Sequence, residues 1–351
     1  MPLTRVELER FTAFTHLDLE LSPGINVLIG ANGTGKTHLL KVCYAACEAS
    51  DGRGSPFSEK LVRVMRPSGG TPGRLVQRSG GNSSATVTVH MGDRKLTATF
   101  SRDGRPADDT ESWRFSKPIR SVYIPAKEML ANAPGFLSLY SAREIYFEEV
   151  YKDILDRAYL PKLREPGQRR KQLLESLGNV IGGSINVKGE EFFLSDHSGD
   201  LEFMLLAEGM RKLGLLWRLI QNGAVGKLEE RTAFSCVDWD EQSILFWDKP
   251  ETNINPSLVG KLMNFLLELQ RDGVQVFIAT HSYVVLKELD LRTKDGDQVM
   301  FHSLHRKEGN NNEDVVCNTA SSFHNIDPDL IADTFTDLYD RQVRRSLGGL
   351  G

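Results

Sequence analysis

The chain has 351 residues, 40% hydrophobic and 26% charged, a composition that supports a folded core in one large or two small domains. Its formal net charge of −4 at pH 7 gives no overall basic character of the kind that marks nucleic-acid binders. No apolar run is long enough to span a membrane and no secretory leader is visible, so we expect a cytoplasmic protein. The four cysteines form no C-x-x-C pair, which argues against a zinc site or a disulfide framework.

The first third of the chain alternates predicted strands with glycine-rich segments. Residues 3–9 and 17–21 alternate apolar and polar side chains and predict an antiparallel pair of strands, which leads into a buried strand at 25–29. Residues 50–84 are rich in glycine, serine, proline and arginine, so we expect a mobile loop there, interrupted by a short apolar piece. Residues 85–100 predict a hairpin.

The strongest motif is a phosphate-binding loop at residues 30–37, which read G-A-N-G-T-G-K-T. The loop follows the apolar strand and precedes a helical run, which is the context that the motif requires. Its glycines let backbone N–H groups turn toward phosphate oxygens, and the helix start adds partial positive charge. We therefore expect ATP and Mg²⁺ as cofactors, with the Thr37 hydroxyl as a metal ligand. The nucleotide-binding residues in this loop are Gly30, Asn32, Gly33, Gly35, Lys36 and Thr37.

Two apolar strands in the second half of the chain end in polar residues. Residues 243–248 end in Asp248, and residues 274–281 end in His281. A carboxylate at the tip of a buried strand beside a phosphate loop can hold Mg²⁺, and a histidine there can hydrogen-bond a γ-phosphate. A strand-end histidine is more often structural, but the helix predicted at 258–270, between the two strands, favours the functional interpretation.

Two helical segments lie between the hairpin and the Asp248 strand. Residues 137–178 are helical in pattern and strongly charged, and prolines interrupt them, so we expect an inserted helical arm too short for a long coiled coil. Further on, Glu208 and Gly209 open a long apolar helix. Backbone N–H groups at such a start can contact an anion, although an ordinary helix N-terminus explains this segment equally well.

Taken in this order, the segments resemble an ABC-type ATPase of the SMC-like class, related to OLD-family ATPases. The phosphate loop, the signature-like segment 206–212, the strand ending in Asp248, the loop D-K-P-E-T-N-I-N-P and the Thr-His pair at 280–281 carry the resemblance. In detail the chain looks like the stand-alone ATPases of bacterial anti-phage systems, Septu and retron-associated types among them. The resemblance implies an α/β P-loop NTPase head with a mixed central sheet, an antiparallel β subdomain and an inserted helical arm.

The same resemblance divides the chain into four parts. Residues 1–126 form an N-terminal lobe with the phosphate loop, and residues 127–183 form the helical insertion. Residues 184–290 form a C-terminal lobe with the signature and the two strand-end residues, and residues 291–351 complete the head.

Heads of this class close face to face, and the phosphate loop of one head and the signature of the other sandwich each ATP. Carried over to this chain, the resemblance implies that Ala207, Glu208 and Gly209 face the γ-phosphate across a homodimer interface. It also implies that the loop with Asn253 and Asn255 crosses to the partner's site. Higher oligomers and DNA are further partners that the class allows, and no membrane is expected.

Position 249 departs from the class, because Lys249 stands where the class has a catalytic glutamate. A charged lysine has no acceptor and cannot deprotonate water, and loss of a general base lowers a rate about 10²–10⁴-fold. Lys249 could instead pair with Glu251 or with phosphate, giving a head that binds ATP and hydrolyses it slowly. Glu251 is a substitute base, but two residues further on we expect it to point elsewhere. A one-nucleotide change converts Glu to Lys, so a selected or engineered variant is an alternative.

Two further features of the class are harder to place. Gln77 is the candidate for the glutamine that contacts Mg²⁺ and water, although it lies in the glycine-rich stretch. OLD-family proteins continue into a Toprim nuclease domain, which needs a glutamate and an Asp-x-Asp strand end. Asp295 and Asp297 have that spacing but lie in a predicted turn. Asp238 and Asp240 also have it but lie in a polar loop. We therefore expect no nuclease in this chain.

Three functional hypotheses follow. The leading one is a dimeric ATP-driven switch that controls a separate effector, a nuclease or toxin, in anti-phage defence, with 50–84 and 127–180 as partner-binding surfaces. The second is a non-catalytic ATP-dependent scaffold, which Lys249 motivates. The third is an SMC-like DNA-repair ATPase, which the absence of a long coiled coil and of basic charge disfavours and which salt-sensitive DNA binding would revive.

Overall fold

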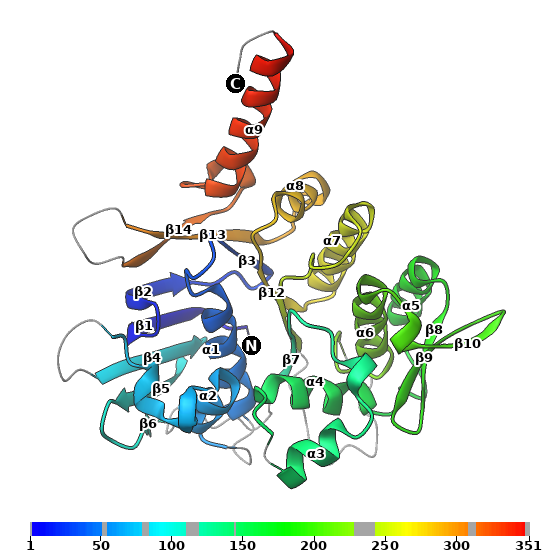
Figure 1. Ribbon diagram of the computed structural model, residues 1–351, viewed down its shortest axis with the longest axis horizontal. Helices are drawn as coiled ribbons and strands as arrows, with labels where there is room; N and C mark the ends of the chain where they lie inside the picture. Colours follow the sequence, from blue (N-terminus) through cyan, green and yellow to red (C-terminus); the bar gives the residue numbers. More distant parts are fainter. Residues whose placement is uncertain are drawn as a thin grey trace.

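The computed structural model describes residues 2–50, 55–78, 84–109, 119–143, 145–227, 243–307 and 314–347. In this part of the chain the strands form a six-stranded mixed sheet, a five-stranded antiparallel sheet and a three-stranded sheet. Helices flank the six-stranded sheet, and the five-stranded sheet lies beyond the helix that follows the phosphate loop (Figure 1). The prediction of an α/β fold with a mixed central sheet and an antiparallel subdomain is confirmed.

The central sheet has the order β14-β13-β3-β12-β11-β7. Its strands are β3 (Ile25–Ile29), β7 (Arg120–Ile124), β11 (Ser243–Asp248), β12 (Gln275–Ala279), β13 (Val299–Arg306) and β14 (Val315–Ala320). All neighbours are parallel except β13 and β14. Every residue of β3, β11 and β12 is buried, as in strands covered on both faces, which explains why most of their residues are apolar. Because parallel strands end at one edge, the segments that follow these three strands meet there.

The two faces of the central sheet contribute to different cores. Alternate β3 residues such as Val27 pack with α6 (Glu208–Gln221) and α7 (Pro256–Arg271). On the opposite face, Leu28 packs with α1 (Lys36–Ala49) and with the antiparallel sheet. Helix α1 is therefore enclosed between two sheets, which fixes the phosphate loop from behind.

The antiparallel sheet has the order β2-β1-β4-β5-β6. Its strands are β1 (Arg5–Phe11), β2 (Phe14–Glu20), β4 (Ser84–Met91), β5 (Arg94–Ser101) and β6 (Ala107–Asp109). β4 alternates buried and half-buried residues along its length, as expected of a strand with one face on a core. The two predicted N-terminal strands and the predicted hairpin are confirmed.

Part of the segment expected to be a loop, 50–84, is a helix instead. Helix α2 (Phe57–Met65) packs on α1, with Phe57, Leu61 and Val64 completely buried, and two short 3₁₀ turns, Ser68–Gly70 and Pro72–Leu75, follow it. Glycine and proline dominate the composition on both sides of this short amphipathic helix, so the sequence pattern did not predict it. Residues 51–54 and 79–83 of the segment lie outside the described residues.

The helical insertion is broken into short helices that pack on the head. They are the 3₁₀ turn Leu130–Asn132, α3 (Phe136–Arg143), α4 (Glu149–Tyr159) and α5 (Gln168–Ile181). Buried ion pairs fasten α4 to α1 and α2, since Lys60 Nζ lies 2.6 Å from Asp153 and Arg157 lies 3.0 Å from Glu48. The three-stranded sheet follows, with β8 (Ser184–Lys188), β9 (Glu191–Asp196), β10 (Gly199–Glu202) and the 3₁₀ turn Phe203–Leu205.

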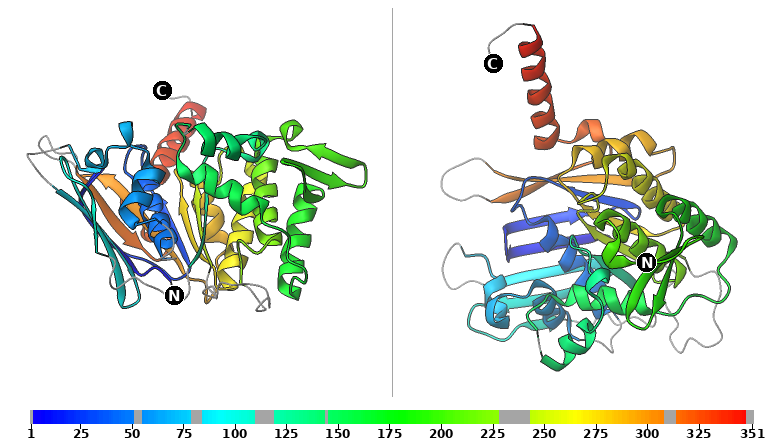
Figure 2. Two further views of the ribbon diagram at one scale, coloured as in Figure 1. Left: turned by 90° about the horizontal axis from the view of Figure 1, so that it is seen from below. Right: turned by 45° about the vertical axis from the view of Figure 1, so that its right-hand side comes forward.

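The last elements are α8 (Tyr283–Arg292), strands β13 and β14, the 3₁₀ turn Phe323–Asn325 and α9 (Leu330–Ser346). Helix α9 projects from the head in Figure 1 and in the right-hand view of Figure 2. Asp297 is held in its predicted turn by Arg271, which keeps the pKa of the Asp297 carboxyl below its usual range. In the ranges that the structure describes, every helix is too short or too polar to cross a membrane.

Candidate functional site: the nucleotide edge of the central sheet

The phosphate loop joins β3 to α1 in a backbone form that needs glycine. Gly30 has φ +141°, and a Cβ there would lie 2.1 Å from the Leu304 carbonyl oxygen. Gly35, the N-cap of α1, has φ +88°, and a Cβ there would lie 2.5 Å from the Phe14 ring. A side chain at either position would collide with its neighbour and strain the backbone, so the loop conformation depends on these glycines.

Lys36 lies back over its own loop. Its Nζ donates to the carbonyl oxygens of Gly30 and Ala31, each at 2.7 Å. Burial, and then the nearby charge of Lys249, lower the pKa of Lys36 to about 8. The Lys36 ammonium group thus donates to neutral carbonyl oxygens of its own loop. An anionic phosphate would be a stronger acceptor and could replace them.

Thr37 and Asp248 meet at this edge although they are far apart in sequence. The Thr37 hydroxyl donates to Asp248 Oδ2 at 3.0 Å. Asp248 Oδ1 and the Tyr123 hydroxyl are both buried without a hydrogen-bond partner among the described residues. Burial, and then the charge of the Asp248 carboxylate, raise the pKa of the Tyr123 phenol. Burial raises the pKa of the Asp248 carboxyl. A buried carboxylate oxygen without a partner beside a threonine hydroxyl is a donor set that fits Mg²⁺, which prefers oxygen ligands.

Lys249 follows Asp248 in a constrained backbone form. Its φ is +50°, which is rare for a residue with a side chain, and its N–H donates to the Ala279 carbonyl at the end of β12. Its charge is close enough to lower the pKa of Lys36. The lysine therefore adds positive charge to the nucleotide edge, where the SMC-like class has a carboxylate.

Glu251 turns back toward the site, contrary to our expectation that it points elsewhere. The Thr280 hydroxyl donates to Glu251 Oε1 at 2.8 Å, while Glu251 Oε2 is buried without a hydrogen bond in the described residues. Glu251 also contributes to the electrostatic environment of Lys36. The turn formed after Lys249, whose carbonyl accepts from the Thr252 N–H, reverses the chain and explains this direction. The carboxylate lies beside the segment that carries His281.

His281 is exposed directly after Thr280. Thr280 is buried and its hydroxyl accepts from the Ser282 N–H at 3.0 Å. The backbone on both sides of His281 is therefore fixed, while the imidazole itself faces solvent at the nucleotide edge. This is a suitable position for a side chain that contacts a ligand only when one is bound.

The signature-like segment forms a second cluster. Helix α6 begins at Glu208 with Ala207 as its N-cap. A Cβ on Gly209 would lie 2.5 Å from the Asn253 carbonyl oxygen, and the Asn253 amide donates to Glu208 at 2.6 Å. The cluster is therefore packed and hydrogen-bonded within one chain, in contrast to the orphaned oxygens at the nucleotide edge.

Lys212 and Asn255 complete this cluster. Lys212 is fully buried, and its Nζ donates to the Thr252 carbonyl at 2.9 Å, so the turn after β11 is tied to α6. Asn255 Oδ1 accepts from the Ser257 N–H at 3.0 Å and caps α7. The Asn255 side chain therefore caps α7 within the chain, and the crossing of its loop to the site of a partner stays a prediction.

Gln77 is not brought to Thr37 and Asp248. Its side-chain amide pairs with the Thr15 hydroxyl at 2.9 Å on the antiparallel sheet, and its N–H donates to the Arg10 carbonyl. Its assignment as a metal-contacting glutamine therefore has no geometric support in this structure. The alignment failed because the surrounding glycine-rich segment offers no periodic pattern to anchor it.

Two residues at the edges of the site were missed in the sequence. Arg306, at the end of β13, donates to the Gly33 carbonyl at 3.5 Å, and Lys212 holds the turn after β11. Neither belongs to a motif of fixed spacing. Arg306 could have been found only by noticing that β13 lies beside β3, which requires the topology.

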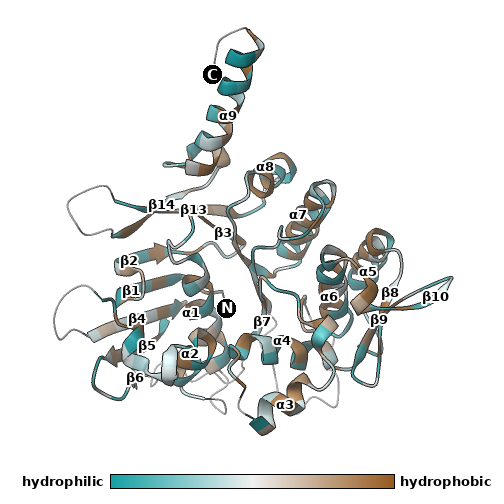
Figure 3. Cartoon of the chain, in the orientation of Figure 1, coloured by the Kyte–Doolittle hydropathy of each residue, from teal (hydrophilic) through white to brown (hydrophobic). Residues whose placement is uncertain are grey.

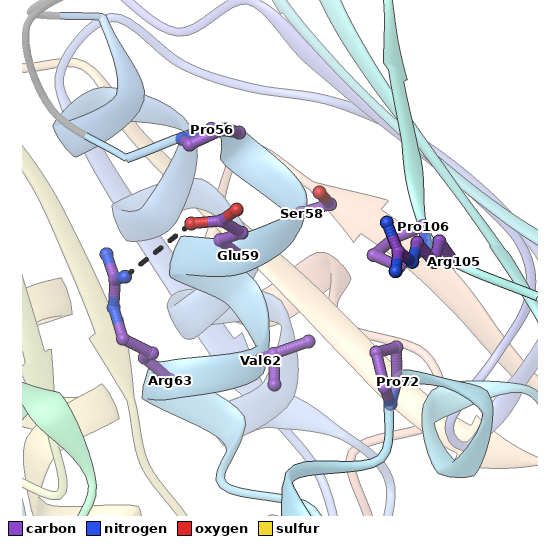
Figure 4. Close-up of a pocket in the computed structure, with 8 residues that line it drawn as sticks. All are labelled: Pro56, Ser58, Glu59, Val62, Arg63, Pro72, Arg105 and Pro106. Atoms are coloured by element: carbon purple, nitrogen blue, oxygen red, sulfur yellow. Dashed lines mark ion pairs between the residues drawn. The ribbon is translucent and has the colours of Figure 1, made fainter.

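A pocket of about 520 Å³ lies elsewhere, on α2 (Figure 4). Its lining residues are Pro56, Ser58, Glu59, Val62, Arg63, Pro72, Arg105 and Pro106. Glu59 and Arg63 are 3.9 Å apart on the same helix face. None of the predicted site residues lines this pocket, so it is separate from the nucleotide edge.

The sequence is similar to known protein families and to curated relatives. Residues 77–287 match the family described as "AAA domain, putative AbiEii toxin, Type IV TA system", and residues 5–112 match a second AAA-domain family. The DNA replication and repair protein RecF of Ligilactobacillus salivarius (strain UCC118) is 30% identical over 183 residues, 50% of this chain and 44% of that protein. RecF of Bacillus mycoides (strain KBAB4) is 32% identical over 102 residues, 29% of this chain and 26% of that protein. The match spans less than half the length of these curated relatives.

The fold has a counterpart among solved structures. The crystal structure of the SmcHead bound to the C-winged helix domain of ScpA aligns with a TM-score of 0.53 and 12% identity, over 92% of this chain and 98% of that chain. At this identity the likeness concerns the fold alone. The first family match covers more than half of this chain, so the chain belongs to this AAA-domain family. Its fold is that of an SMC head.

Proposed function

We propose that this chain is a dimeric, ATP-binding and slowly hydrolysing switch of the SMC-like ABC type that controls a separate effector, a nuclease or toxin, in anti-phage defence. The buried, unpartnered Asp248 Oδ1 beside the Thr37 hydroxyl carries the proposal, since it leaves a place for a cation next to the phosphate loop. The toxin named in the description of the matching family supports the defence part.

Different residues of the nucleotide edge would bind the phosphates and the metal ion. The loop N–H groups and Lys36 would hold the phosphates, and Thr37 with Asp248 would hold Mg²⁺. Mg²⁺, when bound, supplies charge neutralisation at the β- and γ-phosphate oxygens. His281 is exposed at the same edge and is placed to hydrogen-bond the terminal phosphate.

Slow hydrolysis follows from the residues available to accept a proton from water. Lys249 cannot accept one while it is charged. Glu251 is a carboxylate with a free buried oxygen, but its other oxygen is bound to Thr280. We infer that Glu251 is the remaining base and that its position, two residues beyond the usual one, limits the rate.

Dimerisation through the heads is supported by the surface beside the signature. Met204 and Leu205, three and two residues before Ala207, are 63% and 70% exposed, which is unusual for two adjacent large apolar residues. The internal bonds between Glu208 and Asn253 preform this surface. A second head that brings its phosphate loop to Gly209 would cover both apolar side chains.

The test is ATP turnover by the purified chain beside its Lys249→Glu variant, with oligomeric mass recorded with and without Mg-ATP. We expect slow turnover in the unmodified chain, turnover increased about 10²–10⁴-fold in the variant, and a larger mass with Mg-ATP in both. The Lys261→Glu variant, with the same charge change at an exposed position of α7, is the matched control and should behave as wild type. Equal turnover in wild type and Lys249→Glu would show that Lys249 does not limit hydrolysis.

A DNA-repair ATPase is the second candidate, and the matches to RecF favour it. The segment 162–171 contains five basic residues, of which Arg169 pairs with Glu268 and Asp272 and Arg170 donates to buried carbonyls. The other three, Lys162, Arg164 and Lys171, are exposed. DNA binding by the purified chain that weakens steeply with salt would favour this candidate over an effector switch.

A further inference from the structure

Helix α9 carries an apolar stripe that no described residue covers. The exposed fractions are 48% for Leu338, 67% for Tyr339, 36% for Val343 and 82% for Leu347, just beyond the helix. Residues three or four positions apart lie on one side of a helix, so these side chains form a continuous stripe. Hydrophobic and hydrophilic residues mix along the projecting helix (Figure 3).

The base of α9 is fixed to the head, while the rest stands free. The Phe335 ring stacks on Tyr283 of α8 with centroids 4.7 Å apart, and Ile331 is buried. Most of the helix extends away from the other elements in the right-hand view of Figure 2. Isolated helices of this length are marginal in water, so a helix with an apolar stripe gains much of its stability from a packing partner.

Charge changes sign along α9. The acidic residues Asp333, Asp337 and Asp340 precede the basic residues Arg341, Arg344 and Arg345, and Arg341 pairs with Asp337 at 3.0 Å within the helix. The helix dipole favours this order within one helix. The order of charges also makes the helix complementary to an antiparallel copy of itself, because the acidic segment 333–340 of each copy then lies beside the basic segment 341–345 of the other. A parallel copy would place like charges together.

We infer that α9 pairs with α9 of a second copy of this chain in an antiparallel, two-fold symmetric contact. Tyr339 lies at its centre, and Phe335 of one copy lies opposite Val343 of the other. A two-fold contact of this kind uses the same patch on both copies, so each substitution acts twice. This contact needs no nucleotide and is separate from the head surface around Gly209.

The pairing is weak and reversible. A helix of 17 residues is about 25 Å long, so the pair buries less than the roughly 1,200 Å² of a stable interface. Association therefore depends on protein concentration. It becomes strong when a second contact between the same copies raises their effective concentration.

Sedimentation velocity without nucleotide, over a concentration series up to about 100 µM, tests the pairing, because weak complexes need that range. We expect concentration-dependent dimerisation in the unmodified chain and at least a tenfold weaker association in Leu338→Glu, which buries two new carboxylates. Leu291→Glu is the matched control, because Leu291 is also exposed, at 70%, but lies on α8. Equal association in Leu338→Glu and the unmodified chain, or no association in the series, would overturn the proposal.

Disulfide trapping tests the direction. The variants Ala332→Cys and Ser346→Cys place one thiol near either end of the stripe, in a background with Cys236 and Cys317 replaced by serine. Antiparallel pairing predicts a cross-link between the two variants when they are mixed and little cross-linking of either alone. Cross-linking of each variant with itself would contradict the antiparallel arrangement. Circular dichroism of each variant verifies that the fold is retained.

Discussion

The nucleotide edge and the signature cluster lie on the same head but differ in how completely their polar groups are satisfied. At the nucleotide edge, one oxygen each of Asp248 and Glu251 is buried without a hydrogen bond in the described residues. At the signature cluster, Glu208, Asn253 and Lys212 are bonded to one another or to the turn after β11. The first region is incomplete without a ligand, whereas in the second the side chains of Glu208, Asn253 and Lys212 are hydrogen-bonded within a single chain.

This difference shows how one fold can serve both as a ligand site and as a docking surface. Unsatisfied buried oxygens cost stability and are retained where a cation or a proton donor completes them. A cluster that is already satisfied gains nothing internally from a ligand, and it presents a fixed surface to a partner. Substitutions in the two regions should therefore have opposite effects on folding and on binding.

The largest expected effect is on hydrolysis. Glu251→Gln should lower the residual ATP turnover by about 10²-fold or more, because the amide keeps the shape of the side chain and cannot take a proton. Phosphate release measures the rate. Glu191→Gln, an exposed change on β9, is the control. Turnover unchanged in Glu251→Gln would remove this residue from the reaction and leave the nucleotide edge without a base.

Gly209→Ala tests the signature cluster. The new methyl group would lie 2.5 Å from the Asn253 carbonyl, so α6 and the turn must separate, at a cost of about 1–3 kcal/mol in the free energy of unfolding. Urea denaturation measures this loss. Gly189→Ala is the control, since no atom lies within 4 Å of a Cβ there, although its φ of +61° adds strain. A Gly209→Ala protein of unchanged stability would show that the cluster is loose.

The pH dependence of ATP binding tests Lys36. Its pKa near 8 in the free protein is below the ordinary 10.5, because burial disfavours the charged form. An anion favours protonated Lys36, so binding above pH 8 must take up a proton. The affinity should fall by up to about tenfold per pH unit above pH 8 and stay level below it. Calorimetry in buffers of different ionisation enthalpy measures the proton uptake. An ATP affinity that is constant from pH 7 to 10 would contradict the role given to Lys36.

The smallest expected effect is a gain in stability. Burial raises the pKa of Asp248 above 3.8, so its ionisation favours the unfolded chain, and the free energy of unfolding falls as the pH rises through the folded pKa. At neutral pH, Asp248→Asn should relieve this penalty and stabilise the nucleotide-free protein by about 1 kcal/mol, as at other strained functional sites. Thermal unfolding without nucleotide measures the gain; a loss of stability would mean that the ionised carboxylate supports the fold.

The polar residues at the ends of the central strands could be predicted from the sequence, because each follows a local run of apolar residues. The apolar runs before Gly30, Asp248 and His281 identify buried parallel strands, and parallel strands end at one edge. The direction of Glu251 could not be predicted, since it depends on the turn after Lys249 with its positive φ. Lys212 and Arg306 act across long sequence distances and belong to no motif.

The secondary structure of the glycine-rich part was predicted least well. Helix α2 forms there because Phe57, Leu61 and Val64 bury themselves on α1, a tertiary effect that outweighs the local composition. The same composition led to the assignment of Gln77, which lies on the antiparallel sheet beside Thr15. Segments without periodicity carry too little information to place a single side chain.

The oligomeric mass of the Leu338→Glu variant tests the central comparison most directly, because this background removes the α9 contact. Sedimentation would be measured with Mg-ATP, with ATP and EDTA, and with Mg-ATP after the further change Asp248→Asn. We predict a doubled mass only with Mg-ATP and an intact Asp248. The cation completes the nucleotide edge of one copy, and the signature cluster of a second copy then docks on that edge. The same mass in all three samples would contradict this account.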